Sequence, residues 1–208
     1  MKAWLVLLLA LAATLGPARA AEPPEFVLKP ASKATLDLVR AGGYVLYMRH
    51  GSTDTSRPDR APQVDLNDCS TQRPLTEEGR RLAVRLGDYL RKAALPLGEI
   101  YASPLCRAKE SALAAFGERF KVEVGLMYSG NMTSEEKQPT LKKTRELLSA
   151  PVKAGSNRLI VAHAPNLMDL IGYFPKPEGT IVVFRPLNGA GFEYVASIQP
   201  EQWPELLK

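Results

Sequence analysis

The chain contains few of the residues from which metal centres are built. Its 208 residues include two histidines, His50 and His163, and two cysteines, Cys69 and Cys106. These side chains are of the kind that zinc takes, but their spacing matches no zinc pattern. An arginine also stands directly beside His50 and another beside Cys106, and both would repel a cation. We therefore expect no metal site.

Long runs of like charge are missing as well. The formal net charge is +5, and it becomes +3 if the first twenty residues, with Lys2 and Arg19, are removed. Without a run of lysine or arginine, nucleic-acid binding gets little support. A local positive pocket for an anionic ligand remains compatible with this charge.

Only the N-terminus contains a long apolar run, and it has the pattern of a secretory signal peptide. Lys2 is followed by an apolar run over residues 3–15 and by the A-x-A cleavage site Ala18-Arg19-Ala20. The run is too short to span a bilayer comfortably, and no cysteine for acylation lies near the cleavage point. We expect residues 1–20 to be a signal peptide, the mature protein to be periplasmic or secreted, and no stable membrane anchor.

An exported chain meets an oxidising environment, which permits its two cysteines to pair. The sequence leaves two alternatives open: a disulfide between Cys69 and Cys106, or a buried thiol at Cys106 and an unpaired one at Cys69.

Residues 21–208 have the organisation of one α/β domain, without repeats or a linker. Apolar strand-like segments alternate with helical ones, which indicates βαβ units and a largely parallel sheet. The last two strands, joined by a turn, predict an antiparallel hairpin at one edge. The predicted strands are 44–49, 99–102, 122–126, 158–162, 181–184 and 191–198, and the predicted helices are 35–41, 76–93, 104–116, 141–148 and 166–171.

Both histidines directly follow a predicted strand. The carboxyl ends of parallel strands meet at one edge of a sheet, where ligands bind, so His50 and His163 are expected to converge there. Arg49 precedes His50, and Arg107 falls in the first turn of a helix that follows a third strand. Helix N-termini favour anions.

Two guanidinium groups and two imidazoles at one place predict a phosphate pocket. Arginine forks match phosphate oxygens in pairs, and fixed positive charge stabilises a phosphoryl group in transfer. One neutral histidine can attack phosphorus and form a covalent phosphohistidine, while the other donates hydrogen bonds.

The chain resembles the histidine phosphatase superfamily, the phosphoglycerate-mutase-like proteins. The resemblance rests on four motifs that occur in the family's order and span most of the mature chain. They are Arg49-His50-Gly51-Ser52-Thr53, Leu75-Thr76-Glu77-Glu78-Gly79-Arg80, Ser103-Pro104-Leu105-Cys106-Arg107-Ala108-Lys109-Glu110-Ser111-Ala112 and Val161-Ala162-His163.

This resemblance implies that His50 is the nucleophile and that Arg49, Arg107 and His163 complete the phosphate pocket. It also implies a three-layer α/β/α sandwich with a mostly parallel central sheet, a small phosphorylated substrate, and no metal or organic cofactor. Segment 68–73 is similar to periplasmic members related to lipopolysaccharide-core heptose phosphatases. The acid-phosphatase branch, with an aspartate directly after the second histidine, is disfavoured because Ala164 stands there.

The proton donor for the leaving group is left open. Family members use a carboxylic acid, and the candidates are Glu135, Glu136 and Asp54. For Arg73, at the end of the long loop 52–73, the alternatives are a substrate contact and a solvated loop arginine, and we favour the second because loop arginines are more often solvated. That loop and loop 127–138 are expected to select the substrate.

We therefore predict an exported phosphatase that hydrolyses a phosphate monoester through a phosphohistidine on His50. The alternative is a protein that binds phosphate or phosphoesters in the same pocket with little catalysis. It is kept because the sequence shows no obvious carboxylic acid to protonate the leaving group. A mutase is disfavoured, because rearranging metabolites suits the cytoplasm. The sequence does not specify the substrate or the oligomeric state.

Overall fold

The computed structural model describes residues 25–60 and 64–208. The expected signal peptide therefore lies outside the described residues. The strands are β1 Val45–Arg49, β2 Leu97–Ala102, β3 Lys121–Val122, β4 Asn157–Ala162, β5 Ile181–Pro186 and β6 Phe192–Ile198. The helices are α1 Lys33–Ala41, α2 Glu77–Lys92, α3 Cys106–Phe116, α4 Gln138–Ser149, α5 Ala164–Ile171 and α6 Trp203–Leu206, with the 3-10 turns η1 Cys69–Thr71, η2 Val124–Leu126, η3 Ser129–Asn131 and η4 Pro200–Gln202.

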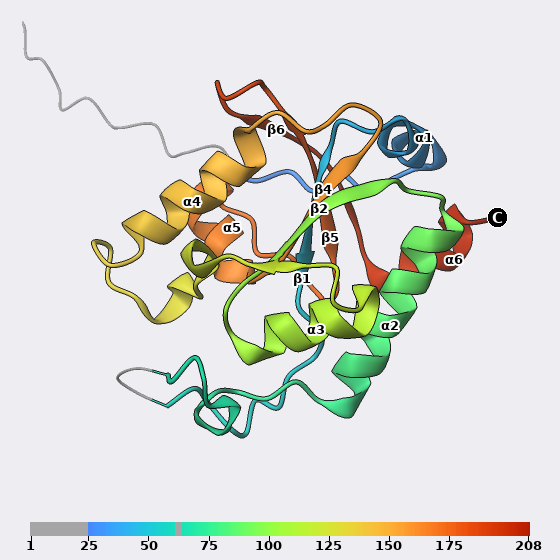
Figure 1. The fold of residues 1–208 in the computed structure, drawn as a ribbon. Coiled ribbons are helices and arrows are strands. Elements are labelled where there is room, and N and C mark those ends of the chain that lie inside the picture. The colour runs from blue at the N-terminus through green and yellow to red at the C-terminus, as the bar shows by residue number, and fades with distance from the viewer. Residues whose placement is uncertain (1–24, 61–63) are drawn as a thin grey trace, which may run out of the picture.

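One six-stranded sheet in the order β3-β2-β4-β1-β5-β6 forms the centre (Figure 1). The strands β3, β2, β4 and β1 are parallel, and β5 and β6 run antiparallel at the other edge. The prediction of a mostly parallel sheet closed by an antiparallel hairpin is confirmed.

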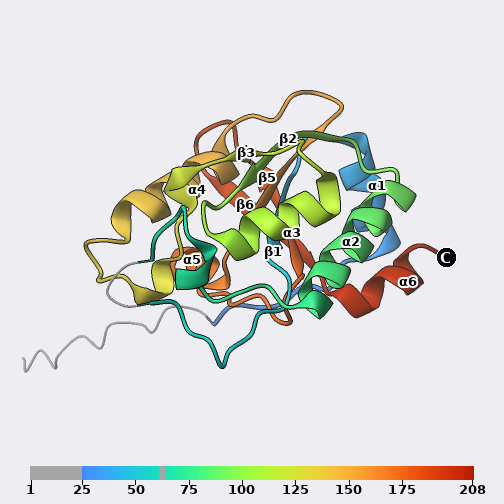
Figure 2. The same ribbon diagram turned by 60° about the horizontal axis from the view of Figure 1, so that its bottom comes forward.

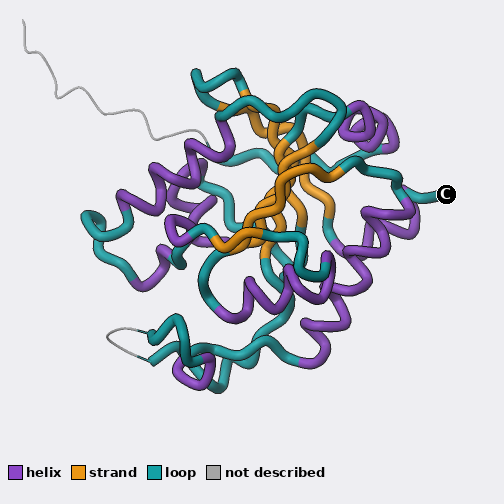
Figure 3. The backbone as a smooth tube through the Cα atoms, in the orientation of Figure 1, coloured by secondary structure: helices purple, strands orange, loops and turns teal. Residues whose placement is uncertain are grey.

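Helices cover both faces of the sheet and make three layers (Figures 2 and 3). Buried residues of α1, α2, α3 and α6 pack with one face, and those of α4 and α5 pack with the other. Each strand of the sheet centre is apolar on both faces because both are covered, as in the fully buried β4. No helix within residues 25–60 and 64–208 has both the length and the apolar character needed to cross a membrane.

Local sequence signals explain where the main helices begin. The Thr76 hydroxyl accepts a hydrogen bond from the backbone N–H of Gly79, and Glu77 and Glu78 stand in the first turn of α2. The Ser32 side chain caps α1 in the same way by accepting from Thr35.

The predicted strand at 122–126 is wrong. Only Lys121 and Val122 pair with β2, and the chain then turns into η2. The turn forms because the Glu123 carboxylate accepts the backbone N–H of Gly125 at 2.9 Å, while Leu126 is buried. The apolar residues of this segment therefore belong to a short strand and a turn with the buried Leu126, and not to one continuous strand.

Candidate active site

Three parallel strands end side by side at the candidate site. The backbone N–H of His50, after β1, donates to the carbonyl of Ala162 at 3.1 Å. The backbone N–H of Ser103, after β2, donates to the carbonyl of Val161 at 2.9 Å. Both acceptors are the last residues of β4, directly before His163. The expected convergence of His50 and His163 at one sheet edge is therefore confirmed.

The segment after His50 is held by two close backbone approaches. A Cβ on Gly51 would lie 2.3 Å from the carbonyl oxygen of Gly79, and a Cβ on Gly79 would lie 2.1 Å from that of Ser52. Neither position has room for a side chain, so the start of α2 lies directly on this turn. Ser111 of α3 accepts the Gly51 N–H at 3.0 Å and donates to the Arg107 carbonyl at 2.7 Å.

The hydrogen bond of the His50 ring fixes its tautomer. Nδ1 lies 2.7 Å from the carbonyl oxygen of Gly51, and because a carbonyl only accepts, Nδ1 holds the hydrogen and Nε2 the free lone pair. Burial, followed by the charge of Arg107, lowers the pKa of His50 well below its usual value. His50 is therefore a neutral imidazole with an unprotonated Nε2, as a nucleophile requires.

The second imidazole, His163, packs against the first with ring centroids 5.3 Å apart. Tyr47 holds its backbone: the phenol donates to the His163 carbonyl at 2.8 Å and accepts the His163 N–H at 3.1 Å. Burial, then the charge of Arg107, lowers the pKa of His163 as well.

The His163 ring shares one hydrogen bond with Ser103. Its Nε2 lies 2.7 Å from the Ser103 hydroxyl, which also accepts the backbone N–H of Leu105 at 3.3 Å. The buried Nδ1 has no partner among the described residues. If the hydroxyl donates to Nε2, Nδ1 holds the hydrogen and is a donor for an anion.

Arg107 is the most deeply placed cation of the site. Its side chain is fully buried and forms a two-pronged ion pair with Asp59, with N–O distances of 2.8 and 3.2 Å. The guanidinium also lies over the ring of Tyr128, 5.1 Å from its centroid. The carboxylate and the aromatic ring thus fix the orientation of the arginine fork.

Arg49 is held on the other side of the site. Its Nη1 donates to the carbonyl of Pro175 at 2.9 Å, its Nη2 pairs with Glu178, and its guanidinium lies 5.2 Å from the centroid of the Phe174 ring. Arg49, Phe174 and Glu178 also line an open cavity of about 420 Å³, together with Lys176, Pro177 and Gln199. The cavity therefore meets the candidate site at Arg49.

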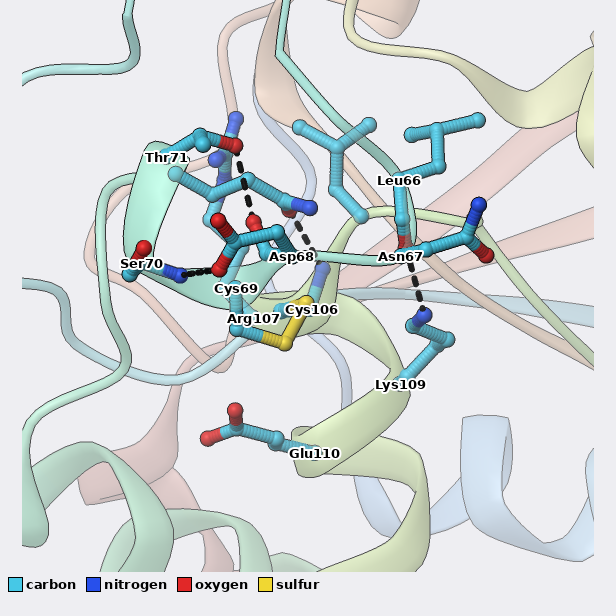
Figure 4. The surroundings of a disulfide bond; sticks show 12 residues. Leu66, Asn67, Asp68, Cys69, Ser70, Thr71, Cys106, Arg107, Lys109 and Glu110 are labelled. Atoms are coloured by element: carbon cyan, nitrogen blue, oxygen red, sulfur yellow. Dashed lines mark hydrogen bonds between the residues drawn. A yellow bond between two sulfur atoms is a disulfide. The ribbon is translucent and has the colours of Figure 1, made fainter.

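Cys69 and Cys106 form a disulfide, which decides between the two alternatives that the sequence left open (Figure 4). The bond joins η1, at the end of the long loop, to the first residue of α3. Beside it the Gln72 side chain accepts the backbone N–H of Cys106 at 2.7 Å. The bonded sulfurs are not available as zinc ligands. Across residues 25–60 and 64–208, no three His, Cys, Asp or Glu side chains are grouped so as to hold a metal ion.

The second loop expected near the substrate lies against α5. Asn166 accepts the backbone N–H of Ser129 at 3.3 Å and donates to the carbonyl of Met127 at 2.9 Å. Between these anchors, the Tyr128 ring stands edge-on to the His163 ring at 5.4 Å. Tyr128 therefore contacts both His163 and Arg107.

None of the three candidate proton donors is held in the site: two hydrogen-bond to neighbouring residues in their own loops, and the third is exposed. Asp54 accepts two hydrogen bonds from Ser56, which lower its pKa. The Glu136 carboxylate accepts the backbone N–H of Thr133 at 2.8 Å, and hydrogen bonding to Thr133 lowers the pKa of Glu136 as well. Glu135 is exposed. A carboxyl with a lowered pKa is a poorer acid at neutral pH, so the geometry favours none of the three.

Sequence reasoning missed several polar neighbours of the pocket, and it was wrong about Arg73. This arginine is partly buried, and its charge lowers the pKa of His50, His163, Arg49 and Arg107. The sequence did contain a signal for this. Arg73 lies three residues before Thr76, the N-cap of α2, and this helix starts beside His50. No spacing rule indicated Asp59 or Tyr128, because both reach Arg107 from loops.

Comparison with known proteins gives a fold and a family match over part of the chain. Residues 45–128 match the family model described as histidine phosphatase superfamily (branch 1). Among solved structures, the protein histidine phosphatase SixA complexed with tungstate has 17% identity and a TM-score of 0.52, with 76% of this chain and 98% of that chain covered. A search of curated proteins gave no match.

Two further structures share the fold. A Nakamurella multipartitia protein given the name phosphohistidine phosphatase SixA has 20% identity and a TM-score of 0.51, over 76% of this chain and 95% of that one. The ecdysone phosphate phosphatase of Bombix mori, complexed with tungstate, has 16% identity and a TM-score of 0.50, over 76% and 92%.

Proposed function

We propose that the chain is a member of the histidine phosphatase superfamily, supported by the family match over residues 45–128 and by the shared fold, and that it hydrolyses a phosphate monoester through a phosphohistidine intermediate on His50. The observation that supports this most strongly is the state of the His50 ring. Its Nδ1 hydrogen is committed to Gly51, and its pKa is lowered, so Nε2 is free to attack.

In the first step the Nε2 lone pair forms a bond to phosphorus while the ester P–O bond breaks. The leaving oxygen keeps the bonding electrons and takes a proton from a water molecule, which gives the alcohol and hydroxide. The imidazole becomes positively charged as it is phosphorylated, and the Nδ1–H bond to Gly51 stabilises that charge. In the second step that hydroxide attacks phosphorus, the N–P electrons return to Nε2, and phosphate leaves.

The surrounding cations lower the energy of both steps. Negative charge spreads over the phosphoryl oxygens during transfer, and Arg49 and Arg107 supply fixed positive charge for it. The guanidinium of Arg107 retains buried N–H groups beyond the two that Asp59 uses, since its Nε has no partner among the described residues. His163 adds a further donor if Ser103 holds the tautomer described above.

We also propose that the protein acts outside the cytoplasm, in the periplasm or after secretion. The support is the signal-peptide pattern of residues 1–20 together with a disulfide, which oxidising compartments favour. The substrate is then a small phosphorylated molecule met there. The similarity of segment 68–73 to heptose phosphatases makes a phosphorylated heptose the first compound to test.

The test is phosphate release by the purified protein from a panel of phosphorylated sugars and p-nitrophenyl phosphate. We expect turnover by the wild type and a loss of about 1,000-fold or more in His50→Ala. Glu118→Gln is the control and should retain wild-type rates, because Glu118 is an exposed carboxylate to which no role in the site is assigned. Full turnover by His50→Ala would contradict the proposal, and phosphate binding without release from any ester would favour the binding protein instead.

A further inference from the structure

Arg73 is a third arginine beside the pocket, and unlike Arg49 and Arg107 it has no role in the reaction proposed for His50. It stands at the end of the long loop and is fixed there by its backbone. Its N–H donates to Asp59 Oδ1 at 2.8 Å, and the same oxygen accepts Arg107 Nη1 at 2.8 Å. One carboxylate oxygen therefore joins the main chain of Arg73 to the guanidinium of Arg107.

The residues around Arg73 are anchored on both sides. Ahead of it, the buried Gln72 side chain binds the first N–H of α3, and the adjoining η1 is tied to α3 by the disulfide. After it, the Pro74 carbonyl accepts the Asp54 N–H at 3.1 Å and Thr76 N–H donates to Ser52 at 2.9 Å. The place of Arg73 is thus set by the fold, not by a free loop.

The charges of the pocket are not balanced by the residues that surround it. Asp59 pairs with Arg107 and Glu178 pairs with Arg49. Within the described chain, the guanidinium of Arg73 has neither an ion pair nor a hydrogen bond, and its Nε is buried without a partner. A third cation beside two paired ones leaves an excess of positive charge.

Arg73 is also near enough to act on every group of the pocket. Its charge lowers the pKa of both histidines and of both other arginines. A partly buried cation that repels four neighbours is unfavourable unless an anion joins them. Phosphate esters supply such an anion, and their oxygens accept hydrogen bonds from arginine.

We propose that Arg73 is a third phosphate-binding arginine, which donates to an oxygen of the phosphoryl group held by Arg49, Arg107 and His163. This assignment deepens the proposed function and rests on it for the identity of the anion. The loop that ends in Arg73 then has a definite purpose. The disulfide and Asp59 hold it so that the arginine of a loop reaches a pocket built on strand ends.

The test compares tungstate binding by calorimetry in the wild type, Arg73→Met, Arg73→Lys and Arg60→Met. Arg60 is an exposed arginine of the same loop and serves as the control. We expect Arg73→Met to bind tungstate roughly 10- to 100-fold more weakly, Arg73→Lys to lose less, and Arg60→Met to match the wild type. Wild-type affinity in Arg73→Met would overturn the assignment.

A second measurement follows the wild-type protein and needs only the conservative Arg73→Lys, whose spectrum identifies the Arg73 Nε–H signal by its absence. In an NMR titration of the wild type with tungstate this signal should shift strongly, and a signal that does not move would overturn the assignment.

The outcomes separate this assignment from the proposed function. Tungstate binding through Arg73 without hydrolysis of any ester would leave the assignment standing and refute the phosphatase. Normal hydrolysis with unchanged KM and tungstate affinity in Arg73→Met would refute the assignment of Arg73 and leave the phosphatase standing.

Discussion

Removing the disulfide should destabilise the domain by an amount that its position sets. Cys69 and Cys106 are 37 residues apart in the sequence. The loss of chain entropy in the unfolded state that a loop of this length implies is about 4 kcal/mol at 25 °C. For a domain of this size that corresponds to a Tm lower by about 8–16 °C in Cys69→Ser/Cys106→Ser.

The same change should weaken phosphate chemistry, because the bond anchors the segment that ends in Arg73 to the helix that begins at Arg107. Differential scanning calorimetry with and without reductant measures the stability, and phosphate release measures the function. Reductant should lower the Tm of the wild type toward that of the double variant and leave the double variant unchanged. A double variant with the wild-type Tm would refute the reasoning.

Three other predictions concern single groups of the site. Asp59→Asn should lose about 3 kcal/mol of stability, because it leaves Arg107 buried and unpaired, and tungstate should restore part of it in denaturant unfolding; unchanged stability would contradict this. Ser103→Ala should lower kcat about tenfold by freeing the His163 tautomer, while Ser103→Thr keeps the rate; equal rates in steady-state assays would exclude the tautomer role. Since the folded pKa of His50 and of His163 is lowered, the unfolded chain alone takes up their two protons below pH about 6.5. The free energy of unfolding should therefore decrease by about 2.7 kcal/mol for each unit by which the pH is lowered below about 6.5. Denaturant unfolding at several pH values measures this, and His50→Gln/His163→Gln should remove that part of the slope.

The arrangement of the main elements could be predicted because each signal is local. The alternation of apolar strands with helices, the Thr76 cap and the final hairpin all depend on neighbouring residues. The strand expected at 122–126 was wrong because the Glu123 carboxylate stabilises a turn there. The short α6 was not predicted, since a four-residue helix has too few positions for a periodic pattern.

The residues of the candidate site likewise fall into those that local signals predict and those that tertiary contacts place. Residues on strand ends and helix starts, such as His50, His163 and Arg107, follow from topology once the strands are known. Asp59 and Arg73 do not, because a long loop brings them to the pocket through tertiary contacts. Their positions depend on the disulfide and on backbone hydrogen bonds that no spacing rule contains.

The most direct test of the central claim is to trap the intermediate. The protein is mixed rapidly with a ³²P-labelled phosphate monoester, denatured in alkali because the N–P bond is labile in acid, and digested for mass spectrometry. We expect a burst of label on His50 before steady turnover and none in His50→Ala. Turnover without label on His50, or label on His163 instead, would contradict it.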